Sequence, residues 1–591
     1  MKNKFLSLFM AVMTCTFIAV SSTGCFPTDT KSTSTDSTVE NTPDNSDSNN
    51  NTDKTDVLDI DTSDLIQITD KDKTTEYDSS AATIKLNGNS IDCSAGSVSI
   101  SGCVATITVP GTYVVSGTLN DGQIIINVDK QEDVHLILDG VDITCSDSAP
   151  IYIMSADKTI VTLAEDSLNT LTDNANYTYS DTESEEPNAA LFSKDNLTIN
   201  GGGALVVNAN FNNGIQTKNH LKILGGNITV TAVNDALKGK DSVTITGGSF
   251  KLDAKGDGIN SSNVEEAGKG YVHISGGEFD ITSGGKGING ATMIIAEGGS
   301  CMVTSDDDSL HSNGDIIISD GKFTLASDDD GIHSDSELTI NGGTVSITRS
   351  YEGLEGGGIT INGGDISVYA SDDGINVASG NDESATGGMW GRDAFASDSS
   401  CNLVIAGGNL YINSSGDGLD SNGTIEMSGG NVVVDGPASS GNGALDYGIS
   451  FEITGGNLIA IGASGMSENV TDGSTQCAAL LNFSGSLGGT MITITDSDNN
   501  VIASIKSTKN WGSLNISTPA IKTGETYNVC SDGTLSGATM IGPECYVGGT
   551  LSGETNLGTF TQTDIIYGEG MGMGSPGGMG GMGGHGGHGG R

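Results

Sequence analysis

A Gly-Gly pair recurs along the middle of the chain, and its regular spacing restricts the folds open to this sequence. Most pairs lie 21–23 residues apart, although insertions lengthen a few steps. A short alternating strand such as 345–347 follows each pair, and a D-G-I/L-like corner lies nine residues after the second glycine. Short strands joined by tight corners at one period predict a solenoid of stacked β-coils. The pairs begin at Gly202, Gly225, Gly247, Gly276, Gly298, Asp320 (Asp-Gly), Gly342, Gly363, Gly407, Gly429 and Gly455.

The predicted fold class is all-β, a right-handed parallel β-helix over 61–469 with rungs of about 22 residues. The chain lacks both the leucine ladder of leucine-rich repeats and the tandem nonapeptides of calcium-binding β-rolls. Residues 470–566 lose the period but stay β-rich, which predicts a C-terminal cap over the last coil. Residues 567–591 are rich in Gly, Met and His, and we expect them to be disordered.

The N-terminus carries an export signal. Two lysines precede an apolar stretch, and small residues then lead to Cys25, so residues 1–25 are typical of a lipoprotein signal peptide with Cys25 as the lipidation site. Ordinary cleavage with an unlipidated Cys25 is the alternative. Residues 26–60 are mostly Ser, Thr, Asp and Asn and predict a disordered linker. We therefore expect an exported protein, either anchored to the membrane by lipid at the cell surface or secreted.

Residues at the same position in successive coils should lie about 4.8 Å apart and form columns. What we call the corner column consists of Asp235, Asp257, Lys286, Asp308, Asp330, Glu352, Asp373 and Asp417. Three residues further on lies the second column, which consists of Lys238, Asn260, Asn289, His311, His333, Glu355, Asn376, Asp420 and, after a slight shift, Asp446.

Stacked carboxylates at this spacing repel one another by roughly 3–4 kcal/mol at an effective dielectric constant near 20, unless cations lie between them. Carboxylate and carbonyl oxygens are the ligands that Ca²⁺ takes, so Ca²⁺ is the expected cofactor. The alternative is that Asp merely favours turn conformations, which explains one Asp per corner better than three in a row. The predicted ligands are Asp306, Asp307, Asp308, Asp328, Asp329, Asp330, Glu352, Asp372, Asp373, Asp417 and Asp420.

The net charge of −50 argues against nucleic acid and against electrostatic binding to anionic membranes. The insertion at 376–400 carries Trp390 and Arg392, which could stack on a sugar and hold a carboxylate, or else pack on the coil wall. Tyr351, His311 and His333 are further candidates for sugar contacts. The two histidines could also ligate a transition metal, but stacking or hydrogen bonding in a corner is the commoner use of such a pair.

Lys286 interrupts the corner column, and charge compensation is its simplest role. A Brønsted base for uronate β-elimination would need a lowered pKa, and neighbouring acids raise it. We therefore assign no catalytic residue. Export permits disulfides, and Cys93–Cys103 and Cys530–Cys545 are close enough in sequence to be plausible pairs, whereas Cys301 and Cys401 lie at apolar strand positions.

The segment "GTYVVSGTLNDGQIIINVDKQEDVHLILDGVDITCSDSAPIYI", together with "DDDGIHSDSELTINGG" and "GGMWGRDAFA", resembles a family of bacterial secreted carbohydrate-binding proteins. The resemblance covers roughly 80–565. It implies a right-handed parallel β-helix similar to calcium-dependent pectate lyases, with calcium along the coils. It also implies binding of plant cell-wall polysaccharide, namely cellulose and acidic sugars such as polygalacturonate.

Three functions follow from these observations. The first is a calcium-dependent carbohydrate-binding protein at the cell surface, expected to be a monomer. The second is a calcium-dependent pectate lyase acting by β-elimination, with Lys286 or Lys238 as base. The third is a structural adhesin or scaffold whose calcium is purely structural, which would bind no sugar.

Overall fold

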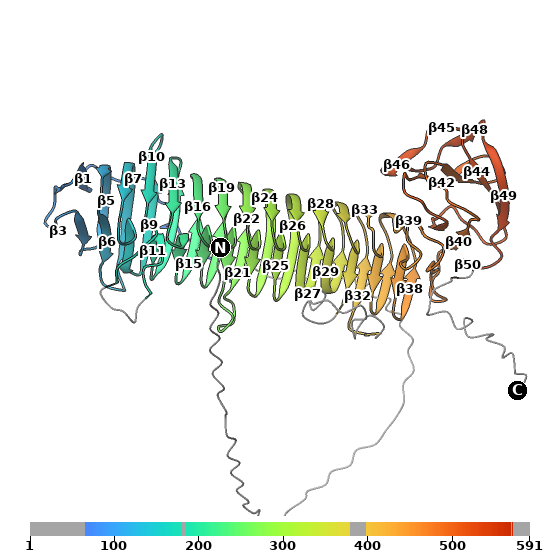
Figure 1. Cartoon of the computed structure of the whole chain (residues 1–591), viewed down its shortest axis with the longest axis horizontal. Coiled ribbons are helices and arrows are strands. Elements are labelled where there is room, and N and C mark those ends of the chain that lie inside the picture. The colour runs from blue at the N-terminus through green and yellow to red at the C-terminus, as the bar shows by residue number, and fades with distance from the viewer. Residues whose placement is uncertain (1–64, 180–184, 379–396, 569, 571–591) are drawn as a thin grey trace, which may run out of the picture. The chain divides into compact units, whose positions relative to one another are not determined.

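The computed structural model describes residues 65–179, 185–378, 397–568 and 570, all within one compact unit, Ile60–Arg591. Every regular element in this part of the chain is a β-strand, and no helix there is long and apolar enough to cross a membrane. The strands of successive coils pair in parallel, as Figure 1 shows from β5 (Gly111–Leu119) to β38 (Ser450–Ile453). The predicted all-β parallel β-helix is confirmed.

Each coil contributes a strand to each of three sheet faces. One face contains β13 (Ala204–Ala209), β16 (Asn227–Ala232) and β19 (Ser249–Ala254). The second contains the short strands β17 (Leu237–Gly239) and β20 (Ile259–Ser261). The third contains β15 (His220–Ile223) and β18 (Ser242–Ile245).

The Gly-Gly pairs make the turn between the third face and the first. In every pair after the first, the second glycine has a positive φ, for example +81° at Gly343 and +114° at Gly248. A β-carbon would strain this left-handed conformation, which explains why glycine returns at that position. The sequence repeat is therefore the repeat of one backbone turn.

Apolar side chains point into the coil and stack in columns of their own. Phe250 and Phe279 lie in register on β19 and β22 (Glu278–Ser283), with ring centroids 4.7 Å apart. Leu325 and Ile347 continue the core with no exposed surface. The alternating pattern of each strand therefore places one set of residues in a continuous core and the other set on the surface.

A separate antiparallel module follows the coils. Its sheet has the order β46 (Thr539–Gly542), β47 (Cys545–Val547), β42 (Val501–Lys506), β41 (Met491–Thr495), β44 (Thr526–Ser531) and β49 (Thr555–Thr561). From the same region, β43 (Ser513–Ser517) pairs with the last coil strand, β39 (Asn457–Gly462). This pairing occupies backbone groups that an open solenoid edge would expose.

The two suggested disulfides are wrong, because Cys93, Cys103, Cys530 and Cys545 are all free thiols. Cys545 lies on β47 and Cys530 on β44, with β42 and β41 between them. Three strand spacings amount to about 14 Å, well beyond the reach of a disulfide. Cys93 ends β2 (Ile91–Cys93), whereas Cys103 lies in the turn of the next hairpin, between β3 (Val98–Ser101) and β4 (Val104–Ile107). Cys301 and Cys401 are buried core residues, as expected.

Candidate functional site

The structure aligns the second column as the sequence predicts. His311 on β25 (Leu310–Ser312) pairs in register with His333 on β27 (Ile332–Ile340). Asn376 on β31 (Ile375–Val377) pairs with Asp420 on β34 (Leu419–Ser421), although 43 residues lie between them in the sequence. Asp420 in turn pairs with Asp446 on β37 (Leu445–Tyr447). The two columns therefore continue along the coils, and we call the corner column and the second column together the ladder.

Besides the calcium binding and the turn preference that the sequence suggests, the corner column takes part in the backbone hydrogen bonding of the coils. The Oδ1 atom of Asp308 accepts a hydrogen bond from the backbone N–H of Asp330 in the next coil, over 3.0 Å. Asp330 accepts in the same way from the N–H of Glu352 over 3.1 Å, and Asp235 from the N–H of Asp257 over 3.1 Å. These three corner carboxylates thus satisfy amides that the turns leave without a backbone partner.

Lys286 breaks this chain of bonds, because an ammonium group cannot accept a hydrogen bond. The N–H of Asp308, one coil further on, donates instead to the Oδ1 of its neighbour Asp307 over 2.8 Å. The two neighbouring acids therefore have separate roles at this corner. Asp307 accepts the hydrogen bond from the amide within the corner, and Asp308 accepts the one from the next coil.

In the first half of the ladder, lysine and histidine side chains pair with every corner carboxylate except Asp257, whose pKa is raised by burial and by Asp235. Lys238 forms a 2.6 Å ion pair with Asp235, and Lys286 forms ion pairs of 2.9 and 2.7 Å with Asp307 and Asp308. Burial alone would raise the pKa of Asp308, but the bonds from His311 and Lys286 lower it to about 2. Burial would likewise lower the pKa of Lys286, and Asp308 and Asp307 raise it above its ordinary value. Lys286 therefore has the properties of a counter-ion rather than of a base.

The two histidines lie inside the ladder. His311 Nδ1 lies 2.9 Å from Asp308 Oδ2, and His333 Nδ1 lies 3.5 Å from Asp330 and 3.4 Å from Glu355. Their rings are 5.0 Å apart at 76° and are almost entirely buried. Burial would lower the pKa of His333, but Asp330 and its acidic neighbours raise it. This placement favours charge balance, and the predicted sugar contacts of the two histidines stay a prediction.

The second half of the ladder lacks such compensation. Glu352, Asp373, Asp417, Asp420 and Asp446 follow one another, and no ion pair with a lysine, arginine or histidine joins any of them among the described residues. Burial, and then repulsion from Asp446 and Asp372, raise the pKa of Asp417 to about 7. Burial and carboxylate neighbours also raise the pKa values of Glu352, Asp373 and Asp420 well above their ordinary range. This half of the ladder is under repulsive strain that protons or a cation would relieve.

Two groups of predicted calcium ligands come together. Carboxylate oxygens of Asp373, Asp417 and Asp420 all lie within 4.8 Å of one another, and so do those of Asp307, Asp308 and Asp329. Both sets offer the hard oxygen ligands that Ca²⁺ takes. The first set fits a cation better, because Lys286 already neutralises Asp307 and Asp308 in the second.

The remaining predicted residues lie around the ladder or outside the described residues. Asp306 and Asp328 are exposed, and Asp328 pairs with Arg349. The partly exposed Tyr351 hydrogen-bonds to Asp372, which raises the pKa of its phenol. Cys25, Trp390 and Arg392 fall outside the described residues.

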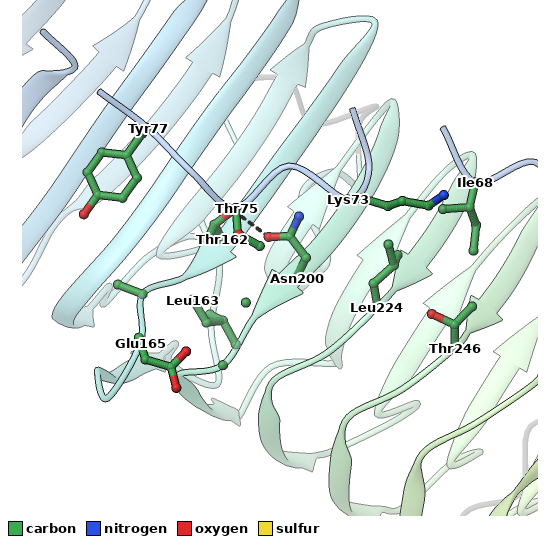
Figure 2. Close-up of a pocket in the computed structure, with 13 residues that line it drawn as sticks. Ile68, Lys73, Thr75, Tyr77, Thr162, Leu163, Glu165, Asn200, Leu224 and Thr246 are labelled. Atoms are coloured by element: carbon green, nitrogen blue, oxygen red, sulfur yellow. Dashed lines mark hydrogen bonds between the residues drawn. The ribbon is translucent and has the colours of Figure 1, made fainter. Parts of the chain in front are cut away.

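A groove on another part of the coils was not predicted. It is a cavity of about 870 Å³ between residues 65–80, which we call the strap, and the ends of successive third-face strands. Figure 2 shows Tyr77 and Glu165 toward one end of the groove, and Ile68, Lys73 and Leu224 toward the other. The strap is laid over the coils and is not part of their hydrogen-bonded sheets.

Asp72 anchors the strap to the coils. Its side chain is fully buried, forms a 2.7 Å ion pair with Lys158 and accepts a 2.7 Å hydrogen bond from Thr198. Lys222 lies 3.4 Å away, and Asn200 donates to the strap carbonyls of Asp72 and Thr74. Burial would raise the pKa of Asp72, but the hydrogen bonds from Lys158, Thr198 and Thr69 lower it well below its ordinary value. The strap is therefore held by specific buried contacts.

Part of the chain is similar to known proteins. Residues 101–353 match a family of carbohydrate-binding domain-containing proteins. A protein of that description from Acetivibrio thermocellus is 50% identical over 148 residues, which is 25% of this chain and 50% of the relative. The chain thus spans about half the length of the curated relative that it matches. The family match covers the floor of the strap groove and the first half of the ladder.

A solved structure is also similar to this chain. It is described as the polysaccharide lyase-like protein from C. thermocellum, as a gadolinium derivative. The two chains are 36% identical, and the match covers 51% of this chain and 98% of the other, with a TM-score of 0.35.

Proposed function

We propose that this protein binds carbohydrate and that calcium in the acidic ladder supports this binding. The observation that carries the first part is the match of residues 101–353 to the carbohydrate-binding family, supported by the relative of the same description. The expected partner is a polysaccharide. We propose plant cell-wall material, with acidic sugars such as polygalacturonate and also cellulose as the ligands to test.

The calcium proposal rests on the unbalanced half of the ladder. Asp373, Asp417 and Asp420 bring three carboxylates together without a neighbouring cationic side chain among the described residues. A bound Ca²⁺ would offset their negative charge and hold two successive coils together through one set of ligands. It would also offer positive charge to a uronate carboxylate, which an acidic protein otherwise repels.

The location is proposed from the sequence. The signal-like residues 1–25, with Cys25 at their end, favour export and a lipid anchor, and the polar segment 26–60 would serve as a tether. A carbohydrate-binding protein held at the cell surface in this way would retain a polysaccharide near the cell.

The lyase alternative receives no support from the candidate bases. Lys286 is held by Asp307 and Asp308, and Lys238 by Asp235. A lysine that accepts a proton from a uronate must first be neutral, and a salt-bridged ammonium is not. Binding without bond cleavage is therefore the proposal that these contacts favour.

The experiment is a polysaccharide pull-down with the full chain, using insoluble cellulose and cross-linked polygalacturonate in calcium and in EDTA. We expect retention on polygalacturonate in calcium and a clear loss in EDTA. An absorbance assay for unsaturated uronate on the same samples should give no product. Retention on neither polymer would reject carbohydrate binding, unchanged retention in EDTA would reject the calcium role, and product formation would favour the lyase.

A further inference from the structure

The strap groove combines features that recognise a sugar. Tyr77 is 45% exposed and offers a ring face, while the half-buried Ile68 and Leu224 supply apolar surface. A cavity of about 870 Å³ lies within the usual range for small-molecule sites, about 300–1,000 Å³. An aromatic face with a few polar groups around an apolar floor suits a pyranose ring, which has an apolar face and a polar rim.

Two charged groups of the groove remain available. The strap has two lysines: Lys71 pairs with Asp133, whereas Lys73 forms no ion pair with any described residue. Glu165 is exposed and likewise forms no ion pair within the described part of the chain. Asn200 and Thr162, by contrast, are engaged with each other and with the strap. Lys73 can donate and Glu165 can accept, so both can bind hydroxyl groups.

The groove extends along the coil axis. Its wall takes Leu163, Gly201, Leu224 and Thr246 from the ends of four successive strands of the third face. Three coil spacings of about 4.8 Å make it about 14 Å long. That length suits a short stretch of a polysaccharide better than a single sugar.

We propose that the strap groove is a calcium-independent binding site for a neutral oligosaccharide, which rests on the proposed carbohydrate-binding function. The carboxylate of Glu165 and the strongly negative chain disfavour a polyuronate here. Neutral glycan in the groove and acidic glycan at the calcium ladder would then be separate activities of one protein. Tyr77 is the stacking residue, and Glu165 and Lys73 bind hydroxyl groups.

Isothermal titration calorimetry of the full chain in EDTA tests this site, with neutral β-1,4-linked hexasaccharides of glucose and of xylose as probes and hexagalacturonate as the acidic comparison. We expect at least one neutral probe to bind and hexagalacturonate to bind more weakly. Tyr77→Ala should weaken neutral binding roughly tenfold or more, and Glu165→Gln about threefold. Tyr77→Phe, which keeps the ring, should stay within about threefold of the native chain. Tyr369→Ala removes a similarly exposed tyrosine (44%) outside the groove and should leave binding unchanged.

The outcomes separate this site from the general proposal. If neutral probes bind but Tyr77→Ala and Glu165→Gln bind as the native chain does, the groove is not the site. If the native chain retains polysaccharide in the pull-down yet binds neither neutral probe, the groove proposal is also overturned while carbohydrate binding stands. If the native chain binds no hexasaccharide and no polysaccharide, both proposals fail. Thermal unfolding of each variant checks that the fold is intact.

Discussion

The carboxylate of Asp308 links its own coil to the coils on both sides: its Oδ1 accepts a hydrogen bond from the N–H of Asp330 in the next coil, and its Oδ2 lies 2.7 Å from the ammonium of Lys286 in the preceding coil. The first contact reaches forward along the coil axis and the second reaches back. Asp330 repeats the forward contact to Glu352. The corner acids are thus part of the backbone hydrogen bonding of the β-helix, and their charges must be neutralised in place.

Removing the acceptor at a corner should destabilise the coils. Asp330→Ala leaves the buried N–H of Glu352 without its partner, and we expect a loss of about 1–3 kcal/mol in the free energy of unfolding. Asp330→Asn keeps a carbonyl oxygen at the same place and should cost clearly less. Urea unfolding of both variants measures the difference. Equal losses would mean that the hydrogen bond contributes little.

The effect of Asp420→Asn on the stability of the chain should have opposite signs with and without calcium. Asparagine already stands at positions 260, 289 and 376 of the same column, so it fits the site. In EDTA the substitution removes one carboxylate from a repelling group and should stabilise the chain by about 1–2 kcal/mol. In millimolar calcium it removes a ligand and should make the variant less stable than the native chain. Thermal unfolding in the two buffers provides the measurement, and a variant that is less stable in both would contradict the repulsion.

Without calcium, stability should fall as the pH rises through the weakly acidic range. In the folded chain the pKa of Asp417 is about 7, against 3.8 for an ordinary aspartate, so the folded state holds a proton that the unfolded state has released. Stability conferred by that proton is full below about pH 4 and is lost by about pH 7. The raised pKa of His333 acts in the same direction, since its stabilising charge is lost as the pH rises.

Unfolding temperatures in EDTA between pH 4.5 and 8 test this pH dependence. Adding calcium should restore more stability at pH 8 than at pH 5, because protons compete for the same carboxylates. The low pKa of Asp308, about 2, affects stability only below this window. A stability in EDTA that rises steadily toward pH 8 would contradict the assignment.

Asp72 should control the attachment of the strap. Asp72→Ala leaves Lys158 and Lys222 without their shared partner, and we expect a loss of about 2–4 kcal/mol in local stability. Limited proteolysis of the full chain should then cut within residues 65–80 faster than in the native protein. Asp70→Ala, at an exposed position of the same strap, is the matched control and should cleave at the native rate. Equal rates for both variants would show that other contacts hold the strap.

The sequence repeat was enough to predict the fold class and the register of the acidic corners. The spacing of the Gly-Gly pairs placed Asn376 beside Asp420 across a long insertion, and the structure pairs them. The same spacing placed Lys286 next to Asp308 in the corner column and predicted charge compensation there, and the structure joins the two in an ion pair. The spacing could not show the strap, since Asp72 meets Thr198 across 126 residues and Lys158 across 86 with no periodic signal.

Calcium titration by isothermal calorimetry of the native chain, Asp420→Asn and Asp280→Asn tests the central claim most directly. Asp280 is an exposed carboxylate on β22, so its variant removes one charge away from the ladder. We predict that the native chain and Asp280→Asn share a calcium site that Asp420→Asn loses or binds at least about tenfold more weakly. The same calcium affinity and stoichiometry in all three proteins would contradict a calcium site in the ladder.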